Sequence, residues 1–146
     1  MYEVKAGGTS IWERWDALRP DGTVNLGKDP GSGLINAVGG GMVSFNHYAN
    51  GAVGDWLYRR VAGLEAIEPG YKKFKVAPLV GGGLTSVSCF KKLSSGTIRI
   101  NWNFENGVFV LSINVPFNTS AVITLPDGEM HEVQSGKYSF KTDLKI

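Results

Sequence analysis

The spacing of the apolar residues changes once along the chain, near Pro69-Gly70, from a helical to a strand-like period. Before this point, the apolar residues of Phe45–Val61 recur at intervals of three and four, and Ser44 is placed to cap a helix at its N-terminus. After it, residues 97–115 alternate between polar and apolar side chains. This division predicts a helical segment followed by a sheet-rich domain.

The alternating residues flank an Asn-Gly pair at Asn106-Gly107, which is the strongest short-range signal for a β-hairpin. A third strand is expected at Ala121–Leu125, where Pro126-Asp127-Gly128 supplies a turn. Short strands separated by frequent turns are typical of a sandwich, so the second part of the chain is predicted to be an antiparallel β-sandwich. Weaker strands are expected at Lys73–Ala77, Thr85–Lys92, His131–Gln134 and Tyr138–Lys141.

The expected helix carries a second stripe opposite its apolar one when it is projected at about 100° per residue. This stripe contains His47, Gly51, Gly54 and Tyr58. Glycines lower helix stability but admit a close neighbour, so we expect the helix to be covered on both faces. Either it packs onto the sandwich, or its natural neighbours lie outside this chain.

Composition excludes several classes of function. The net charge of +2 comes from scattered Lys and Arg, which argues against nucleic-acid binding. The single cysteine, Cys89, forms no disulfide framework, and the two histidines show no metal-ligand spacing. Neither a metal nor another cofactor is expected, and none of the glycine clusters has the form of a phosphate-binding loop. No apolar run approaches the roughly 18 residues of a membrane span, so no membrane partner is expected.

Two segments contain residues whose side chains could take part in catalysis or in ligand binding. In the motif Trp12-Glu13-Arg14-Trp15, two aromatic rings flank a carboxylate, as in sites that stack on sugar rings and activate water. Alternatively, the motif is an amphipathic turn with its tryptophans in the core and Glu13 paired with Arg14 or solvent. His47 is either a ligand in a site or a structural hydrogen-bonding group, and both interpretations stay open.

Three blocks of sequence together resemble the end of glycoside hydrolase family 78, the α-L-rhamnosidases. The blocks are Gly8–Asp16, Ser44–Tyr58 and Pro69–Phe74 with Ala77-Pro78 after it; they occur in the family's order, and the resemblance spans roughly residues 7–126. It implies a mixed α and β fold: a short helical segment, the last piece of an (α/α)6 barrel, followed by an antiparallel β-sandwich. We therefore predict barrel residues at 1–68 and the C-terminal sandwich domain at 69–146.

The resemblance also implies roles for individual residues. Family members are inverting hydrolases, and Glu13 occupies the position of their general base. His47 occupies the position of a residue that contacts rhamnose. The family's general acid comes from an earlier part of the barrel, so this chain is expected to be a C-terminal fragment that is inactive alone. Its partner would be a rhamnosyl-containing carbohydrate in the intact enzyme. The compartment is unknown from the sequence, which leaves the bacterial cytoplasm and the periplasm both open.

Two other functions remain open. The chain could be a non-catalytic carbohydrate-binding or structural β-sandwich module, or a complete small hydrolase. The last is less favoured, because the sequence shows only one of the two carboxylates that a glycoside hydrolase needs. If it is a fragment, the helical part at residues 1–66 should form a homo-oligomer or be weakly ordered, because large exposed apolar surface favours association. The conformation of the glycine-rich stretch 20–42 does not follow from its sequence.

Overall fold

The computed structural model describes residues 2–26 and 43–144, so most of the glycine-rich stretch lies outside the described residues. The chain forms two compact units, Met1–Gly54 and Asp55–Ile146. The helical elements are short: α1 (Tyr2–Lys5), α2 (Tyr48–Gly51), α3 (Val53–Trp56), the π-helical turn η2 (Leu57–Val61) and the 3₁₀ turn η3 (Pro69–Tyr71).

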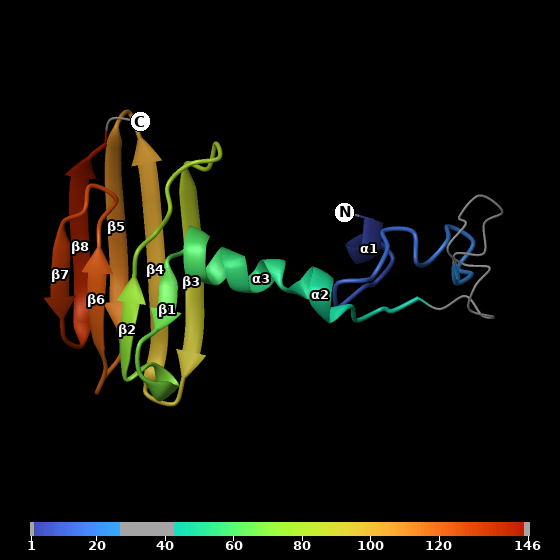
Figure 1. Ribbon diagram of the computed structural model, residues 1–146, viewed down its shortest axis with the longest axis horizontal. Coiled ribbons are helices and arrows are strands. Elements are labelled where there is room, and N and C mark those ends of the chain that lie inside the picture. The colour runs from blue at the N-terminus through green and yellow to red at the C-terminus, as the bar shows by residue number, and fades with distance from the viewer. Residues whose placement is uncertain (1, 27–42, 145–146) are drawn as a thin grey trace. The chain divides into compact units, whose positions relative to one another are not determined.

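Strands occupy most of the second unit and form two four-stranded sheets (Figure 1). The sheet orders are β1-β2-β6-β7 and β3-β4-β5-β8. Every pairing between these strands is antiparallel except that of β2 with β6, which is parallel. The predicted sandwich is confirmed. The strands are β1 (Leu64–Ala66), β2 (Lys73–Val76), β3 (Ser86–Leu93), β4 (Gly96–Glu105), β5 (Val108–Val115), β6 (Ser120–Thr124), β7 (Met130–Val133) and β8 (Gly136–Asp143).

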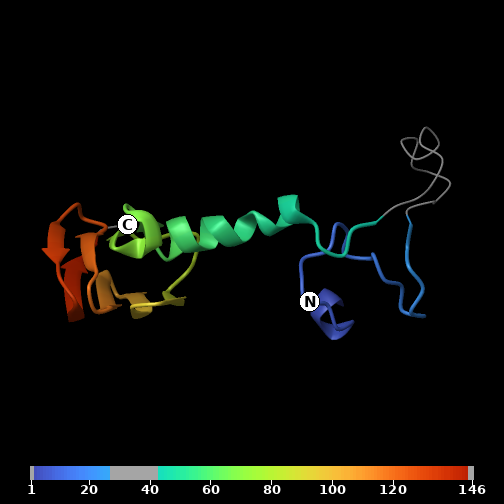
Figure 2. The ribbon, with the colours of Figure 1, turned by 90° about the horizontal axis from the view of Figure 1, so that it is seen from below.

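The hydrophobic core lies between the two sheets, which Figure 2 shows from a second direction. Strand alternation places one set of side chains inside: in β4, Ile98, Ile100 and Trp102 are fully buried, and the residues between them face outward. Phe74 of β2 and Ile123 of β6 belong to the same buried cluster. Packing of these two inner faces therefore holds the sandwich together.

The Asn-Gly hairpin has the expected geometry. β4 and β5 are joined by Asn106 and Gly107 alone, and Glu105 pairs directly with Val108. Both loop residues have positive φ, 51° at Asn106 and 79° at Gly107, as a type I′ turn requires. The twist of this turn matches that of the flanking strands, so a local sequence signal sets their register.

The predicted helix Phe45–Val61 is divided in the structure into α2, α3 and the π-helical turn η2, and its N-terminus also differs. It begins at Tyr48, and its N-cap is His47, whose Nδ1 accepts a hydrogen bond from the backbone N–H of Asn50 at 3.4 Å. The assignment of Ser44 as N-cap is therefore wrong. The backbone N–H and C=O of Ser44 instead bind Glu13, at 2.8 Å each, which keeps this part of the chain out of the helix.

The second unit includes residues ahead of the predicted domain boundary. Val61 and Leu64 are buried in the sandwich core, and β1 pairs with β2. The division into 1–68 and 69–146 stays a prediction about which residues belong to the barrel. The apolar side chains of the helical part are exposed to solvent in large fraction: Trp56 by 50% and Leu57 by 48%. No helix in the described residues is long and apolar enough to cross a membrane.

Candidate functional site

Two segments of the first unit, residues 11–13 and 44–47, lie side by side through backbone hydrogen bonds. The Glu13 N–H donates to the Ser44 carbonyl at 2.8 Å, and the His47 N–H donates to the Ile11 carbonyl at 2.9 Å. These bonds join positions more than thirty residues apart in the sequence. The structure thus brings the segments of the two predicted site residues, Glu13 and His47, together.

The Glu13 carboxylate is half-buried and oriented by backbone. Its Oε2 accepts a hydrogen bond from the Ser44 N–H at 2.8 Å. Its Oε1 accepts none from the described part of the chain. An ionised carboxylate accepts hydrogen bonds through both oxygens. One oxygen therefore anchors the side chain, and the other can accept a proton from a water molecule.

His47 serves as a helix cap and keeps one ring nitrogen for other contacts. Because Nδ1 accepts the Asn50 N–H, the proton of the neutral imidazole lies on Nε2. The ring stacks on Tyr48 with centroids 6.1 Å apart, and Tyr48 itself is 89% exposed. His47 can thus donate a hydrogen bond from Nε2 to a hydroxyl group while its cap interaction holds the ring in place.

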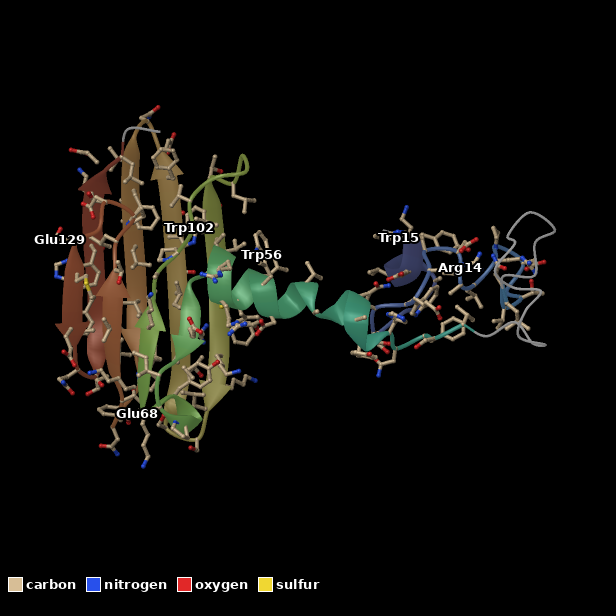
Figure 3. The ribbon with its side chains drawn as sticks, viewed as in Figure 1. Arg14, Trp15, Trp56, Glu68, Trp102 and Glu129 are labelled. Atoms are coloured by element: carbon tan, nitrogen blue, oxygen red, sulfur yellow. The ribbon has the colours of Figure 1, made fainter. Side chains whose placement is uncertain are left out.

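The two tryptophans beside Glu13 have different environments. Trp12 is buried and packs edge-on against Phe45, with ring centroids 5.1 Å apart at 84°. Trp15 is 76% exposed and projects from the first unit (Figure 3). The core-packing interpretation of the motif therefore fits Trp12, which is buried. The sugar-stacking interpretation fits Trp15, whose exposed ring could stack on a sugar.

Asn50 is a residue of this site that the sequence did not reveal. Its side-chain amide donates to the carbonyl oxygens of Trp12 and Glu13, at 3.1 Å each. It therefore ties the start of α2 to the segment that carries the carboxylate. Its place three residues after the cap His47 is the only local signal, and a polar residue in a first helical turn is too common to reveal such a role.

A salt bridge stabilises the chain just after Glu13. Arg14 Nε and Nη2 donate to the two Asp16 oxygens at 3.0 Å each, and Asn25 donates to Asp16 Oδ2 at 2.7 Å. The hydrogen bond from Arg14 is the main reason that the pKa of Asp16 lies below its usual value. Bidentate pairing of this kind restrains the backbone on one side of the motif.

Among residues 2–26 and 43–144, no three His, Cys, Asp or Glu side chains are grouped so that they could hold a metal ion. Cys89 is a free thiol in β3, and burial raises its pKa, so it lacks the features of a nucleophile.

Comparison with known proteins assigns both parts of the chain. The model of the bacterial α-L-rhamnosidase C-terminal domain matches residues 63–140, and that of the bacterial α-L-rhamnosidase 6 hairpin glycosidase domain matches residues 1–61. An α-L-rhamnosidase of Streptomyces avermitilis is 35% identical over 133 residues, which cover 91% of this chain. One of Formosa agariphila is 32% identical over 148 residues, which cover all of it. The chain spans only 12% and 15% of the length of these two relatives.

Solved structures agree with this assignment. The native α-L-rhamnosidase of Aspergillus terreus matches with a TM-score of 0.72 at 36% identity, over 96% of this chain and 15% of that one. The Streptomyces avermitilis α-L-rhamnosidase, solved in complex with L-rhamnose, matches with a TM-score of 0.72 at 32% identity, over 97% of this chain and 14% of that one. The chain belongs to the bacterial α-L-rhamnosidase family and corresponds to its C-terminal part, from the end of the 6 hairpin glycosidase domain through the C-terminal domain.

Proposed function

We propose that the chain is the C-terminal part of an inverting α-L-rhamnosidase that removes terminal α-L-rhamnose from glycosides or polysaccharides. Glu13 acts as the general base, and His47 binds rhamnose hydroxyl groups. The observation that carries this proposal is the backbone pairing of the two segments, since it holds both residues in one part of the first unit. The general acid is supplied by residues beyond this sequence.

The proposed base has suitable contacts for its task. In an inverting reaction one carboxylate takes a proton from water while a second, roughly 6.5–9.5 Å away, protonates the leaving oxygen. Glu13 is restrained through Oε2, so Oε1 is the atom that would receive the proton. The exposed ring of Trp15 is suited to stacking on the apolar face of a sugar beside it.

An activity assay of the isolated chain tests whether the general acid lies outside this sequence. The chain should not hydrolyse an aryl α-L-rhamnoside above background, because losing one member of an acid–base pair costs about 10²–10⁴ in rate. Turnover that disappears in Glu13→Gln would refute the placement of the acid outside this sequence. Glu68→Gln is a matched control, because Glu68 is an exposed carboxylate ahead of η3 (Figure 3).

In the whole enzyme, the same substitution tests the role of Glu13. Glu13→Gln should lower kcat by about 10²–10⁴ with little change in KM, whereas His47→Ala should act mainly on KM. Proton NMR of the first-formed sugar should show β-L-rhamnose, the product of inversion. Retained α-L-rhamnose, or full activity of Glu13→Gln, would contradict the mechanism.

The exposed apolar residues of the helical part are proposed to contact neighbouring barrel helices in the whole enzyme. In the isolated chain they are then expected to promote homo-oligomers through residues 1–66. Light scattering should show a dimer or larger assembly, and Trp56→Glu should weaken it, because Trp56 is half exposed. A monomer at all concentrations would contradict this expectation.

A further inference from the structure

The outward face of the sheet β3-β4-β5-β8 carries a polar, basic surface with no role in the proposed reaction. Cross-strand pairing aligns Arg99 of β4 with Asn114 of β5, and Asn114 with Lys137 of β8. The next row consists of Asn101, Ser112 and Ser139, in the same strand order. Because alternate side chains share a face, both rows point away from the core. We call these six residues the basic face.

Two adjoining hollows of about 400 Å³ each are associated with this face. One lies over the rows of Arg99 and Asn101, and the other lies at the ends of the strands, beside Phe117. Asn114 and Lys137 line both hollows, so the two lie next to each other. Their lining comes from β4, β5 and β8 and from the loops at the ends of these strands, and we call the two hollows together the groove.

The cations of this groove are not neutralised within the described residues. Neither Arg99 nor Lys137 forms a salt bridge there, and both side chains are exposed. The acidic residues of this sheet, Glu105 and Asp143, belong to its opposite end. Each lies six residues along its strand from a cation of the groove, which is about 20 Å at roughly 3.3 Å per residue. The field over the groove is thus positive and suits an anionic ligand.

Phe117 adds an aromatic platform at one end of the groove. It is 80% exposed, so one face of its ring is open to a ligand. The turn that presents it is held by Thr119, whose hydroxyl donates to the Pro116 carbonyl at 2.8 Å; both of these residues are buried. An ordered turn therefore keeps the ring exposed beside the groove.

We propose that this groove binds an oligosaccharide that carries carboxylate groups, that is, a chain with uronic acid residues. Arg99 and Lys137 would pair with carboxylates, and the planar guanidinium of Arg99 can do so through two parallel hydrogen bonds. The amides and hydroxyls of Asn101, Ser112 and Ser139 match sugar hydroxyls as donors and acceptors. Phe117 would stack on the apolar face of a pyranose ring.

A polyphosphate chain such as single-stranded nucleic acid would meet the same charges but is less favoured. Such ligands are usually held by several stacking aromatics and many cations. Among the described residues that line the two hollows, Phe117 is the one exposed aromatic ring, and the chain carries a net charge of only +2. The inference does not depend on the roles of Glu13 and His47, because every residue it uses belongs to the sandwich.

The test is a titration of the isotopically labelled full chain, followed by NMR, with tri-galacturonic acid as the probe. Amide shifts should concentrate in β4, β5, β8 and the turn at Phe117, and affinity should fall as salt is added. The same oligomer with its carboxylates reduced to alcohols should bind at least about 10-fold more weakly. A single-stranded oligonucleotide should produce no comparable shifts.

Variants connect the response to the groove. Arg99→Gln and Lys137→Gln should each weaken binding about 10-fold, and Phe117→Ala should weaken it by a similar factor. Lys75→Gln is the matched control, because Lys75 is an exposed outward residue of β2 in the other sheet. Thermal melts should show that all four variants remain folded, since the changes are at the surface.

Three outcomes would overturn the proposal. The first is binding of the reduced oligomer as strong as that of the acid, which would remove the role of the carboxylates. The second is tighter binding of the oligonucleotide, which would make the face a general polyanion surface. The third is no shift at millimolar probe, or shifts that survive both Arg99→Gln and Lys137→Gln. Each result stands whether or not the proposed hydrolase mechanism holds.

Discussion

The side chain of Trp102 connects β4 to the π-helical turn η2 within the sandwich core, and its substitution allows a quantitative prediction. Trp102 is fully buried in β4. Its indole Nε1 donates to the backbone carbonyl of Val61 at 2.9 Å, at the end of the π-helical turn η2. The substitution Trp102→Phe keeps an aromatic ring but removes this donor and part of the core volume.

The cost can be estimated from these two losses. A buried carbonyl left without its donor costs about 1–3 kcal/mol. A cavity of about 40 Å³ would add about 1 kcal/mol at roughly 24 cal/mol per Å³. Trp102→Phe should therefore lower the free energy of unfolding by about 2–4 kcal/mol. For a domain of this size, that corresponds to a fall in Tm of roughly 10–30 °C.

Urea unfolding followed by far-ultraviolet circular dichroism measures this change without relying on tryptophan fluorescence. The midpoint should fall while the slope m stays constant. Trp15→Phe is the matched control, since the same chemical change at a 76% exposed side chain should alter stability by no more than about 0.5 kcal/mol. Equal midpoints for Trp102→Phe and Trp15→Phe would refute the argument that the buried indole and its hydrogen bond stabilise the sandwich.

Two further predictions concern backbone geometry and acid stability. Gly63→Ala should destabilise the sandwich by more than about 3 kcal/mol in thermal or urea unfolding, because φ is +80° and the added Cβ would lie 2.3 Å from the Ala77 carbonyl carbon. At Gly54 an added Cβ would meet no described atom within 4 Å beyond its chain neighbours and its own helix backbone, so Gly54→Ala should be neutral or stabilising by up to about 1 kcal/mol. Thr142→Val should raise the pKa of Asp127 toward its usual value in an NMR titration, because the Thr142 hydroxyl is the main cause of its lowered pKa. A carboxyl group whose pKa is lower in the folded than in the unfolded state stabilises the fold at neutral pH, and this stabilisation is lost as the pH falls through the folded-state pKa. The loss of stability caused by Thr142→Val should therefore be present at neutral pH and should disappear in strong acid, where Asp127 is protonated in both states.

The strands of the sandwich were predictable because each buries one face. Alternation in residues 97–115 located β4 and β5, and Asn106-Gly107 identified the turn between them. β1, Leu64–Ala66, was missed because three residues are too few to show a period. The parallel pairing of β2 with β6 was also missed, since the choice of neighbour depends on packing between distant segments.

The start of the helix shows how a long-range contact can override a local signal. Ser44 precedes an apolar periodic segment and is a favoured N-cap residue. In the structure its backbone is engaged by Glu13, 31 residues away, and His47 caps the helix instead. The roles of Glu13 and His47 came from resemblance to a family, and no local pattern indicated that their segments pair.

The pairing has a consequence for how the catalytic base would be positioned. The bonds from the Glu13 N–H to Ser44 and from the His47 N–H to Ile11 are made by backbone groups, so they do not depend on the side chain of Glu13 or of His47. Substituting those side chains should therefore change the chemistry while the paired segments persist. Asn50 is different, because its side chain bonds the backbone of the motif directly. In the whole enzyme, Asn50→Ala should lower kcat through misplacement of Glu13, a loss that Glu13→Gln would largely mask. Additive effects of the two substitutions would show that Asn50 acts elsewhere.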